Sequence, residues 1–304
     1  MKNQLPLPFL FILTLFIVKC DSPKNEEIAA PEFISEIEEW RAKRVENLIK
    51  PNGWAALAGL FWLEEGENTF GSNKENNVVF PKSAPENMGS FHLENDSVYI
   101  KINPEIEITL NDSVIYETGL RPDVAGNPNI LHHKSMNWNL IKRGDKYGIR
   151  LRDTLHENRQ NFKGIDYFPI AENWKLEAVF EEYEGGKEMK FKNVLDMETD
   201  QKVEGRLVFK VGEETCALDV LNGGDEDFFV IFADETTGDN TYGGGRYIYV
   251  PRPENRKTFI DFNKAYTPPC GFTDFATCLL PPAQNRLAVS INAGEQYHGH
   301  GHGH

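Results

Sequence analysis

The sequence predicts a mainly β protein: a helix near the N-terminus, then a β-sandwich, then a C-terminal domain of β-barrel or sandwich type. Three observations lead to this prediction. Short runs of apolar and β-branched residues recur along most of the chain, turns rich in glycine and asparagine separate them, and one segment alone has helical spacing. Strand-length runs spaced in this way, with few helices, are typical of sandwiches and barrels.

The predicted helix covers residues 32–48. Its apolar residues Phe33, Ile37, Trp40 and Leu48 alternate with charged residues at helical spacing, and Pro51-Asn52-Gly53 ends the pattern. This segment is the exception in a chain that otherwise reads as strands.

The predicted strands fall into two blocks, 54–120 and 140–295, joined by a connector over residues 121–128 that carries proline and glycine. Two glycine pairs, in Glu184-Gly185-Gly186-Lys187 and Asn222-Gly223-Gly224, are typical of hairpin turns. The strands are expected at residues 77–80, 97–103, 107–110, 147–151, 176–182, 205–210, 217–221, 228–233, 247–250 and 287–291.

The N-terminus predicts export. The apolar run from Leu5 to Val18 is shorter than the ~20 residues that span a bilayer, and it has the length and flanks of a signal peptide. Residues 1–20, ending at Cys20, resemble a bacterial lipoprotein signal, in which the cysteine is lipidated; residues 21–50 then form a polar tether and the helix. The expected location is the cell envelope, on the periplasmic or surface side. The alternative is an ordinary secretory signal, in which Cys20 is incidental.

The balance of acidic and basic residues limits the classes of partner that the protein can bind through charge. The chain has 32 basic and 47 acidic residues and a net charge of −15. Nucleic-acid binding needs clustered positive charge, so that class is excluded, as is adhesion to anionic lipid by charge alone. The expected membrane contact is therefore the lipid anchor, and a small-molecule ligand or a protein partner stays open.

The remaining cysteines predict one disulfide. Cys270 and Cys278 are eight positions apart between two proline pairs, and an exported protein permits disulfides. Free thiols in a core, a metal site or catalysis are the alternatives. Cys216 lies in a predicted strand and is expected to be buried and reduced.

The densest polar segment predicts a candidate site in the second block. A glycine run beside an arginine lets backbone N–H groups and a guanidinium approach one anion together. We expect Arg246 and Asp261 to meet at one concave site, with Tyr242 or Tyr247 as a wall; the alternative is a closed internal salt bridge. The predicted ligand-binding residues are Tyr242, Gly243, Gly244, Gly245, Arg246, Asp261, Asn263 and Arg286, and the catalytic candidates are Asp261 and Cys270.

Four arginines, Arg150, Arg152, Arg246 and Arg286, fall at or beside predicted strands or turns. If two or three of them converge, they make a clamp for a carboxylate or phosphate; for Arg150 and Asp153 a structural Arg–Asp pair is the favoured alternative. His132, His133 and His156 are candidate bases. The sequence has no nucleophile elbow, Walker loop or dinucleotide fingerprint, so it predicts neither a reaction nor a cofactor.

Residues 54–120 resemble a forkhead-associated β-sandwich, through Leu57-Ala58-Gly59-Leu60-Phe61-Trp62-Leu63, Gly71-Ser72, Asn76-Asn77-Val78-Val79-Phe80 and Leu110-Asn111-Asp112. Such domains read phosphothreonine with an arginine after the glycine and a serine and histidine three apart. Here Ser72 occupies the arginine position, and Ser90 and His92 are two apart. The resemblance thus implies the fold without phosphate recognition, and a docking or packing module.

The second block is similar to the domain of unknown function 1684 family. The resemblance rests on Phe162-Lys163-Gly164-Ile165-Asp166-Tyr167-Phe168-Pro169, Thr241-Tyr242-Gly243-Gly244-Gly245-Arg246-Tyr247, Asp261-Phe262-Asn263-Lys264-Ala265-Tyr266 and Pro268-Pro269-Cys270. It is expected to cover nearly all of the mature chain, including the segment from Trp54 to Phe80. The family implies no activity.

Three functions are open. The first is binding, or turnover, of a small anionic or polar molecule in a pocket of the second block; the second is an envelope protein-interaction module. The third is a metal carrier using the tail at 296–304, whose alternating imidazoles belong to His298, His300, His302 and His304. We favour the first.

Overall fold

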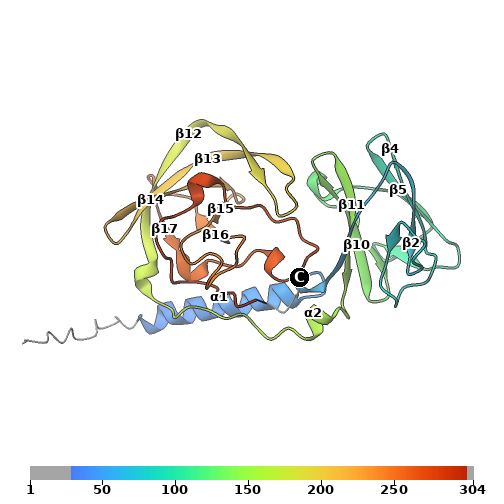
Figure 1. Ribbon diagram of the computed structural model, residues 1–304, viewed down its shortest axis with the longest axis horizontal. Coiled ribbons are helices and arrows are strands. Elements are labelled where there is room, and N and C mark those ends of the chain that lie inside the picture. The colour runs from blue at the N-terminus through green and yellow to red at the C-terminus, as the bar shows by residue number, and fades with distance from the viewer. Residues whose placement is uncertain (1–28, 300–304) are drawn as a thin grey trace, which may run out of the picture.

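The computed structural model of the protein describes residues 29–299 (Figure 1). The predicted signal, Cys20 and most of the histidine tail lie outside this range. Within it, no helix combines the length and apolar character that crossing a bilayer requires. The fold is mainly β, as predicted, with the long helix α1 (Pro31–Ile49) at the N-terminus and a single helical turn α2 (Glu157–Gln160).

Two sheets form a sandwich (Figure 1). The first has the order β1-β11-β10-β9-β6-β7 and the second the order β3-β2-β4-β5-β8. The first sheet consists of β1 (Leu57–Trp62), β11 (Lys146–Asp153), β10 (Met136–Arg143), β9 (Leu131–His133), β6 (Ile108–Leu110) and β7 (Ser113–Ile115). The second consists of β3 (Val78–Val79), β2 (Gly66–Gly71), β4 (Gly89–Glu94), β5 (Ser97–Ile102) and β8 (Glu117–Leu120).

The sandwich core fixes which way the first sheet faces. Trp138 of β10 and Ile149 and Leu151 of β11 are buried in one cluster with Phe70 and Phe91 of the second sheet. Side chains alternate along a strand, so the residues between these apolar positions point to the opposite face. That outer face carries the candidate site described below.

The third sheet forms a nearly closed barrel of order β16-β15-β14-β13-β12-β17. Its interior cluster includes Leu218, Val230 and Ile248, and α1 runs along one side of it (Figure 1). Its strands are β12 (Lys175–Lys192), β13 (Glu198–Val211), β14 (Glu214–Asn222), β15 (Asp227–Phe232), β16 (Arg246–Pro251) and β17 (Lys257–Asp261).

The fold differs from expectation in three places, one of which is the segment 287–291: it was expected to be a strand and is irregular in the structure. β11 pairs with β1 and β10, so the sandwich extends to Asp153 rather than ending near residue 120. The predicted turn at Gly185-Gly186 was wrong: both glycines have positive φ, of 76° and 78°, but they form an irregularity inside β12, where the pairing with β13 shifts register. Glycine permits such a bulge as readily as it permits a turn.

Candidate functional site

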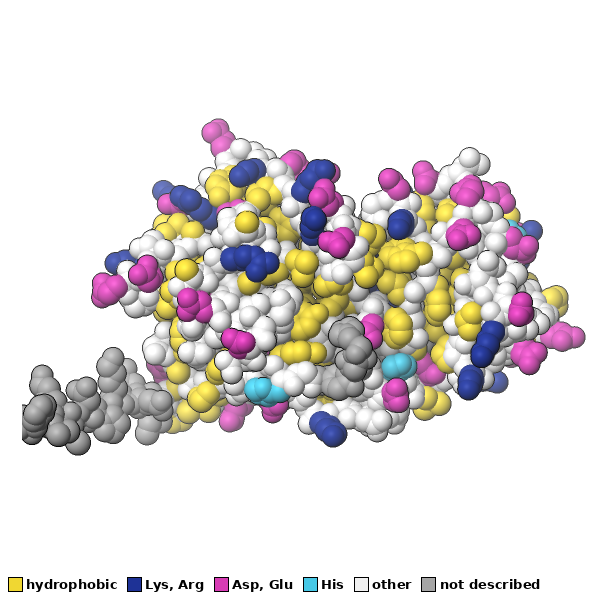
Figure 2. All heavy atoms as spheres, viewed as in Figure 1, with side chains coloured by type: hydrophobic (Ala, Val, Ile, Leu, Met, Phe, Trp, Pro, Cys, Tyr) yellow, Lys and Arg dark blue, Asp and Glu magenta, His cyan; other side chains and the backbone are white. Residues whose placement is uncertain are grey.

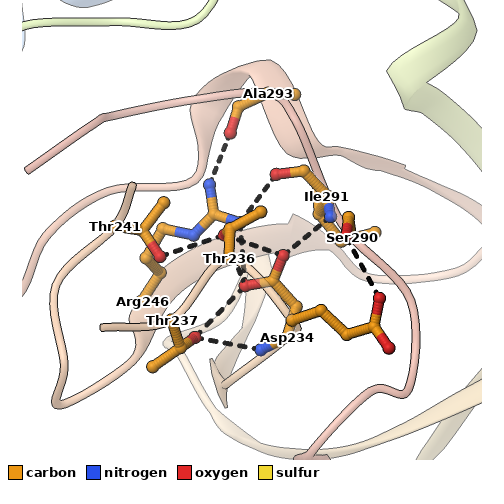
Figure 3. A network of polar contacts seen from close by, with 9 residues as sticks. Asp234, Thr236, Thr237, Thr241, Arg246, Ser290, Ile291 and Ala293 are labelled. Carbon is orange, nitrogen blue, oxygen red and sulfur yellow. Dashed lines mark hydrogen bonds and ion pairs between the residues drawn. The ribbon is translucent and has the colours of Figure 1, made fainter. Parts of the chain in front are cut away.

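Arg246 lies in the barrel as part of a closed network (Figure 3). Its side chain is fully buried, its Nη2 lies 3.2 Å from Asp234 Oδ1, and the guanidinium also donates to the carbonyl oxygens of Ile291 and Ala293. Burial lowers the pKa of Arg246, and the nearby Asp234 acts in the opposite direction. A charge held in this way fixes the loops after β15 and near the C-terminus.

Asp261 lies apart from this network. Its Oδ1 accepts hydrogen bonds from the backbone and side-chain nitrogens of Asn263, and Asn263 in turn bonds the backbone of Ala171. Burial raises the pKa of Asp261. The expected pairing of Arg246 with Asp261 at one concave site is therefore not what the structure contains, because each side chain is used to hold its own loop.

The other residues of that predicted site have separate positions. Gly245 has φ +82°, and a Cβ there would lie 2.4 Å from Pro281 Cγ and 2.5 Å from the Phe232 carbonyl oxygen, so its role is close packing. Tyr242 packs edge-on against Tyr297, and Arg286 is exposed. Gly243 is exposed and Gly244 lies beside the Tyr242 ring.

A disulfide joins Cys270 and Cys278, whose Cα atoms are 6.1 Å apart, and Cys216 is free and buried. Cys270 is thus not a thiol nucleophile in this structure, which removes it as a catalytic candidate. The bridge closes a short loop that contains Thr277, and this loop extends from the barrel to the outer face of the first sheet.

A cleft of about 690 Å³ lies over that outer face. The strand register explains its polar floor: Asn139 of β10 is opposite Arg150 of β11, and Asn137 is opposite Arg152. His132 of β9 lies opposite Asn137 and extends the polar row. All five side chains line the cleft.

Arg150 is the most buried of the cleft's cations, with 5% of its surface exposed. Its Nη2 is 3.4 Å from Thr277 Oγ1, its guanidinium lies 5.4 Å from the Trp54 ring centre, and its buried Nε has no hydrogen-bond partner among residues 29–299. Burial, together with the charges of Arg143 and Arg152, lowers the pKa of Arg150 to about 10. Unlike Arg246, it has no carboxylate within ion-pair distance in the described chain.

Arg152 and Arg143 complete the cluster. Arg152 donates to Asn139 Oδ1 at 3.1 Å, its Nε is buried without a partner in the described part, and burial lowers its pKa. Arg143 is neutralised by Asp123 through contacts of 2.8 and 3.1 Å, and it donates to Thr277 at 3.0 Å. Among the charged residues that line the cleft, the cations Lys134, Arg150 and Arg152 outnumber the carboxylates Asp112 and Asp123, and Asp123 is paired with Arg143.

The remaining sequence candidates do not join this cleft. Asp153 accepts from the Leu155 backbone, His133 Nδ1 bonds the Glu107 carbonyl, and His156 caps α2. At the forkhead-associated positions, Ser72 Oγ bonds the Ala84 carbonyl and Ser90 bonds His92. No group of three metal-ligating side chains occurs within residues 29–299, and this range excludes most of the tail.

The comparisons with known proteins place the chain in a family. A family model described as "Protein of unknown function (DUF1684)" matches residues 160–296. An uncharacterized protein of Haloarcula marismortui, solved by NMR, is 30% identical; the similarity covers 45% of this chain and 78% of that one, with a TM-score of 0.39. The chain belongs to the DUF1684 family.

The DUF1684 match is shorter than the sequence led us to expect, since it begins after β11. It includes Thr277 and the disulfide loop, whereas Arg150 and Arg152 precede it. Two forkhead-associated domain structures are also similar: the FhaA domain, 14% identical over 31% of this chain and 97% of its own, and one from a study of phosphothreonine-dependent interactions, 13% identical over 31% and 92%. Both have a TM-score of 0.21. No curated protein matches the chain.

Proposed function

We propose that this DUF1684 protein binds a small anionic molecule in the cleft over the first sheet, through Arg150 and Arg152. The observation that carries the proposal is a pair of guanidinium groups, the buried Arg150 and the half-buried Arg152, that line a cavity without a carboxylate partner in residues 29–299. A carboxylate or phosphate can accept two parallel N–H bonds from each guanidinium.

The desolvation cost of Arg150 favours a bound anion in the cleft. A buried cation without a partner carries an uncompensated desolvation cost, whereas the same cation beside an anion is paired and hydrogen-bonded. Asn137 and Asn139 add side-chain amides to the same floor, and they suit the remaining oxygens of a bound anion. This cleft replaces the pocket around Arg246 as the expected anion site.

Titration calorimetry with inorganic phosphate tests the proposal. The wild-type protein is expected to bind phosphate, and Arg150→Met is expected to lose at least about 1.5–3 kcal/mol of binding free energy, because a hydrogen bond to a charged group has that value. Arg206→Met is the matched control, since Arg206 pairs with Glu181 on the outside of the barrel. Equal phosphate binding by wild type and Arg150→Met contradicts the proposal.

We further propose that the protein is exported and lipid-anchored through Cys20, which lies outside the described residues. The support is the apolar run that ends at this cysteine. Intact-mass analysis of membrane-extracted protein is expected to show an acyl increment that Cys20→Ser lacks. A soluble mature protein without the increment contradicts the anchor and leaves the anion cleft unaffected.

A further inference from the structure

We propose that the anionic ligand is an acidic saccharide, whose ring binds in a second cavity next to the arginine cleft. This inference rests on the proposed function and assigns its ligand class. The second cavity has a volume of about 400 Å³, and Trp54 lines both it and the cleft. The two cavities thus share the Trp54 side chain as part of their walls, and the Arg150 guanidinium lies 5.4 Å from the centre of that ring.

One wall of the second cavity is a face of α1. Trp40, Lys43, Arg44 and Asn47 have the spacing of residues that share one side of a helix, and all four line the cavity. Arg44 is fixed there by Glu295, at 2.8 Å, while the Lys43 and Asn47 side chains are exposed. The helix therefore places an ammonium and an amide at the rim of the cavity.

The opposite wall is a layer of aromatic rings from the barrel. Tyr249 stacks on Tyr266 with an interplanar angle of 12° and a centroid distance of 6.4 Å, and it contacts Phe229 at 5.1 Å. Tyr247 packs edge-on against both Phe229 and Tyr266. These ring contacts run from Phe229 through Tyr247 and Tyr249 to Tyr266, so this wall presents an aromatic surface to the cavity.

The two walls together favour a saccharide. A sugar ring has C–H faces that pack on aromatic surfaces and hydroxyl groups that bond to amides, ammonium groups and tyrosines, and this cavity supplies both kinds of contact. Quaternary ammonium ligands also bind among aromatic rings, but Arg150 and Arg152 line the adjoining cleft and repel a cation, whereas Lys43 and Arg44 are each paired with a glutamate. Half of the Tyr249 surface is exposed, so the ring layer is accessible.

Competitive calorimetry with three carboxylates tests the ligand class. Acetate reports the arginine cleft without a ring, glucuronate adds a saccharide ring, and benzoate adds a planar aromatic ring. Wild-type protein is expected to bind glucuronate about three- to tenfold more tightly than acetate, which corresponds to the usual contribution of an aromatic contact. In Tyr249→Ala that ratio is expected to fall to about one. Phe259→Ala is the matched control, because Phe259 is equally exposed on β17 and does not line the cavity.

The outcomes separate this inference from the proposed function. If inorganic phosphate binds but glucuronate is no tighter than acetate, or if Tyr249→Ala keeps the wild-type ratio, the saccharide site is refuted and the anion cleft stands. Benzoate binding more tightly than glucuronate refutes the saccharide class. If phosphate, acetate and glucuronate all fail to bind, the proposed function itself is wrong.

Discussion

At the scale of single residues, the buried arginines fall into two kinds. Arg246 and Arg44 are each paired with a buried carboxylate, Asp234 and Glu295, and serve to hold loops and α1 in place. Arg150 has an aromatic ring and a hydroxyl beside it but no such carboxylate within the described chain. The sequence singled out Arg246 and Arg150 as candidates, and it could not show which carboxylate each one meets, because that depends on how the loop after β15 folds against β16.

The buried ion pair between Arg246 and Asp234 predicts that removing either partner strongly destabilises the protein. Asp234→Ala is expected to lower the free energy of unfolding by about 3–5 kcal/mol, because it leaves the fully buried Arg246 without a partner. Urea denaturation measures this. The control is Glu177→Ala, which breaks an exposed pair with Lys257 and is expected to cost less than about 1 kcal/mol. A similar small cost for Asp234→Ala means that Arg246 is not held as described.

The lowered pKa of Arg150 predicts that the affinity for an anion falls at high pH. Arg150 has a pKa of about 10, below its usual value, so the unfolded chain holds more protons than the folded one between the folded and the usual pKa. As pH rises between these two pKa values, the free energy of unfolding therefore increases. Over the same pH range Arg150 loses its positive charge, so the cleft loses its cation. Sulfate affinity, followed by calorimetry because the charge of sulfate is constant, is expected to be level at neutral pH and to fall above about pH 10. Undiminished affinity well above that pH excludes Arg150 as the essential cation.

At the scale of elements, short sequence patterns correctly predicted the helix and one of the hairpin turns, because both depend on neighbouring residues. The helix expected at 32–48 is α1 (Pro31–Ile49), and the turn at Asn222-Gly223-Gly224 does connect β14 and β15. Sheet membership was missed at β11, because its partner β1 lies far away in the sequence. The alternation of Asn137 and Asn139 with Trp138 is visible in the sequence, but only the structure shows that both asparagines are buried and that their face meets another part of the molecule.

The disulfide loop predicts a specific role for Thr277. Its Oγ1 accepts from Arg143 and Arg150, so Thr277→Val leaves two guanidinium groups without this acceptor and is expected to cost about 1–3 kcal/mol of unfolding free energy. Thr277→Ser keeps the oxygen and is expected to restore most of the loss. Chemical denaturation of both variants measures the difference, and equal stability of the valine and serine forms contradicts the contact.

At the scale of the whole molecule, the cleft lies between the outer face of the first sheet and the segment that follows α1, and the barrel loop touches its floor where Thr277 meets Arg150. Hydrophobic side chains gather between the two halves on the face shown in Figure 2. Composition and periodicity predicted both β halves, but neither reports how two halves pack, because that depends on shape and on long-range contacts. A site at such a junction is therefore the hardest part of the molecule to predict from a single sequence.

The burial of Arg150 at this junction also predicts that one substitution there raises the stability of the protein and weakens anion binding. Replacing a buried, unpaired cation with an apolar side chain of similar length removes its desolvation cost, so Arg150→Met is expected to be about 1–3 kcal/mol more stable than wild type without ligand. Anion binding to the folded state then stabilises the wild type by mass action, by about 2.7 kcal/mol at a concentration 100 times the dissociation constant.

Thermal unfolding of wild type and Arg150→Met, each with and without saturating phosphate, tests this account most directly. Arg150→Met is expected to have the higher Tm without phosphate, and phosphate is expected to raise the Tm of the wild type while leaving that of Arg150→Met unchanged. If Arg150→Met is strongly destabilised, or if phosphate shifts both proteins equally, Arg150 is a structural residue and the cleft is not an anion site.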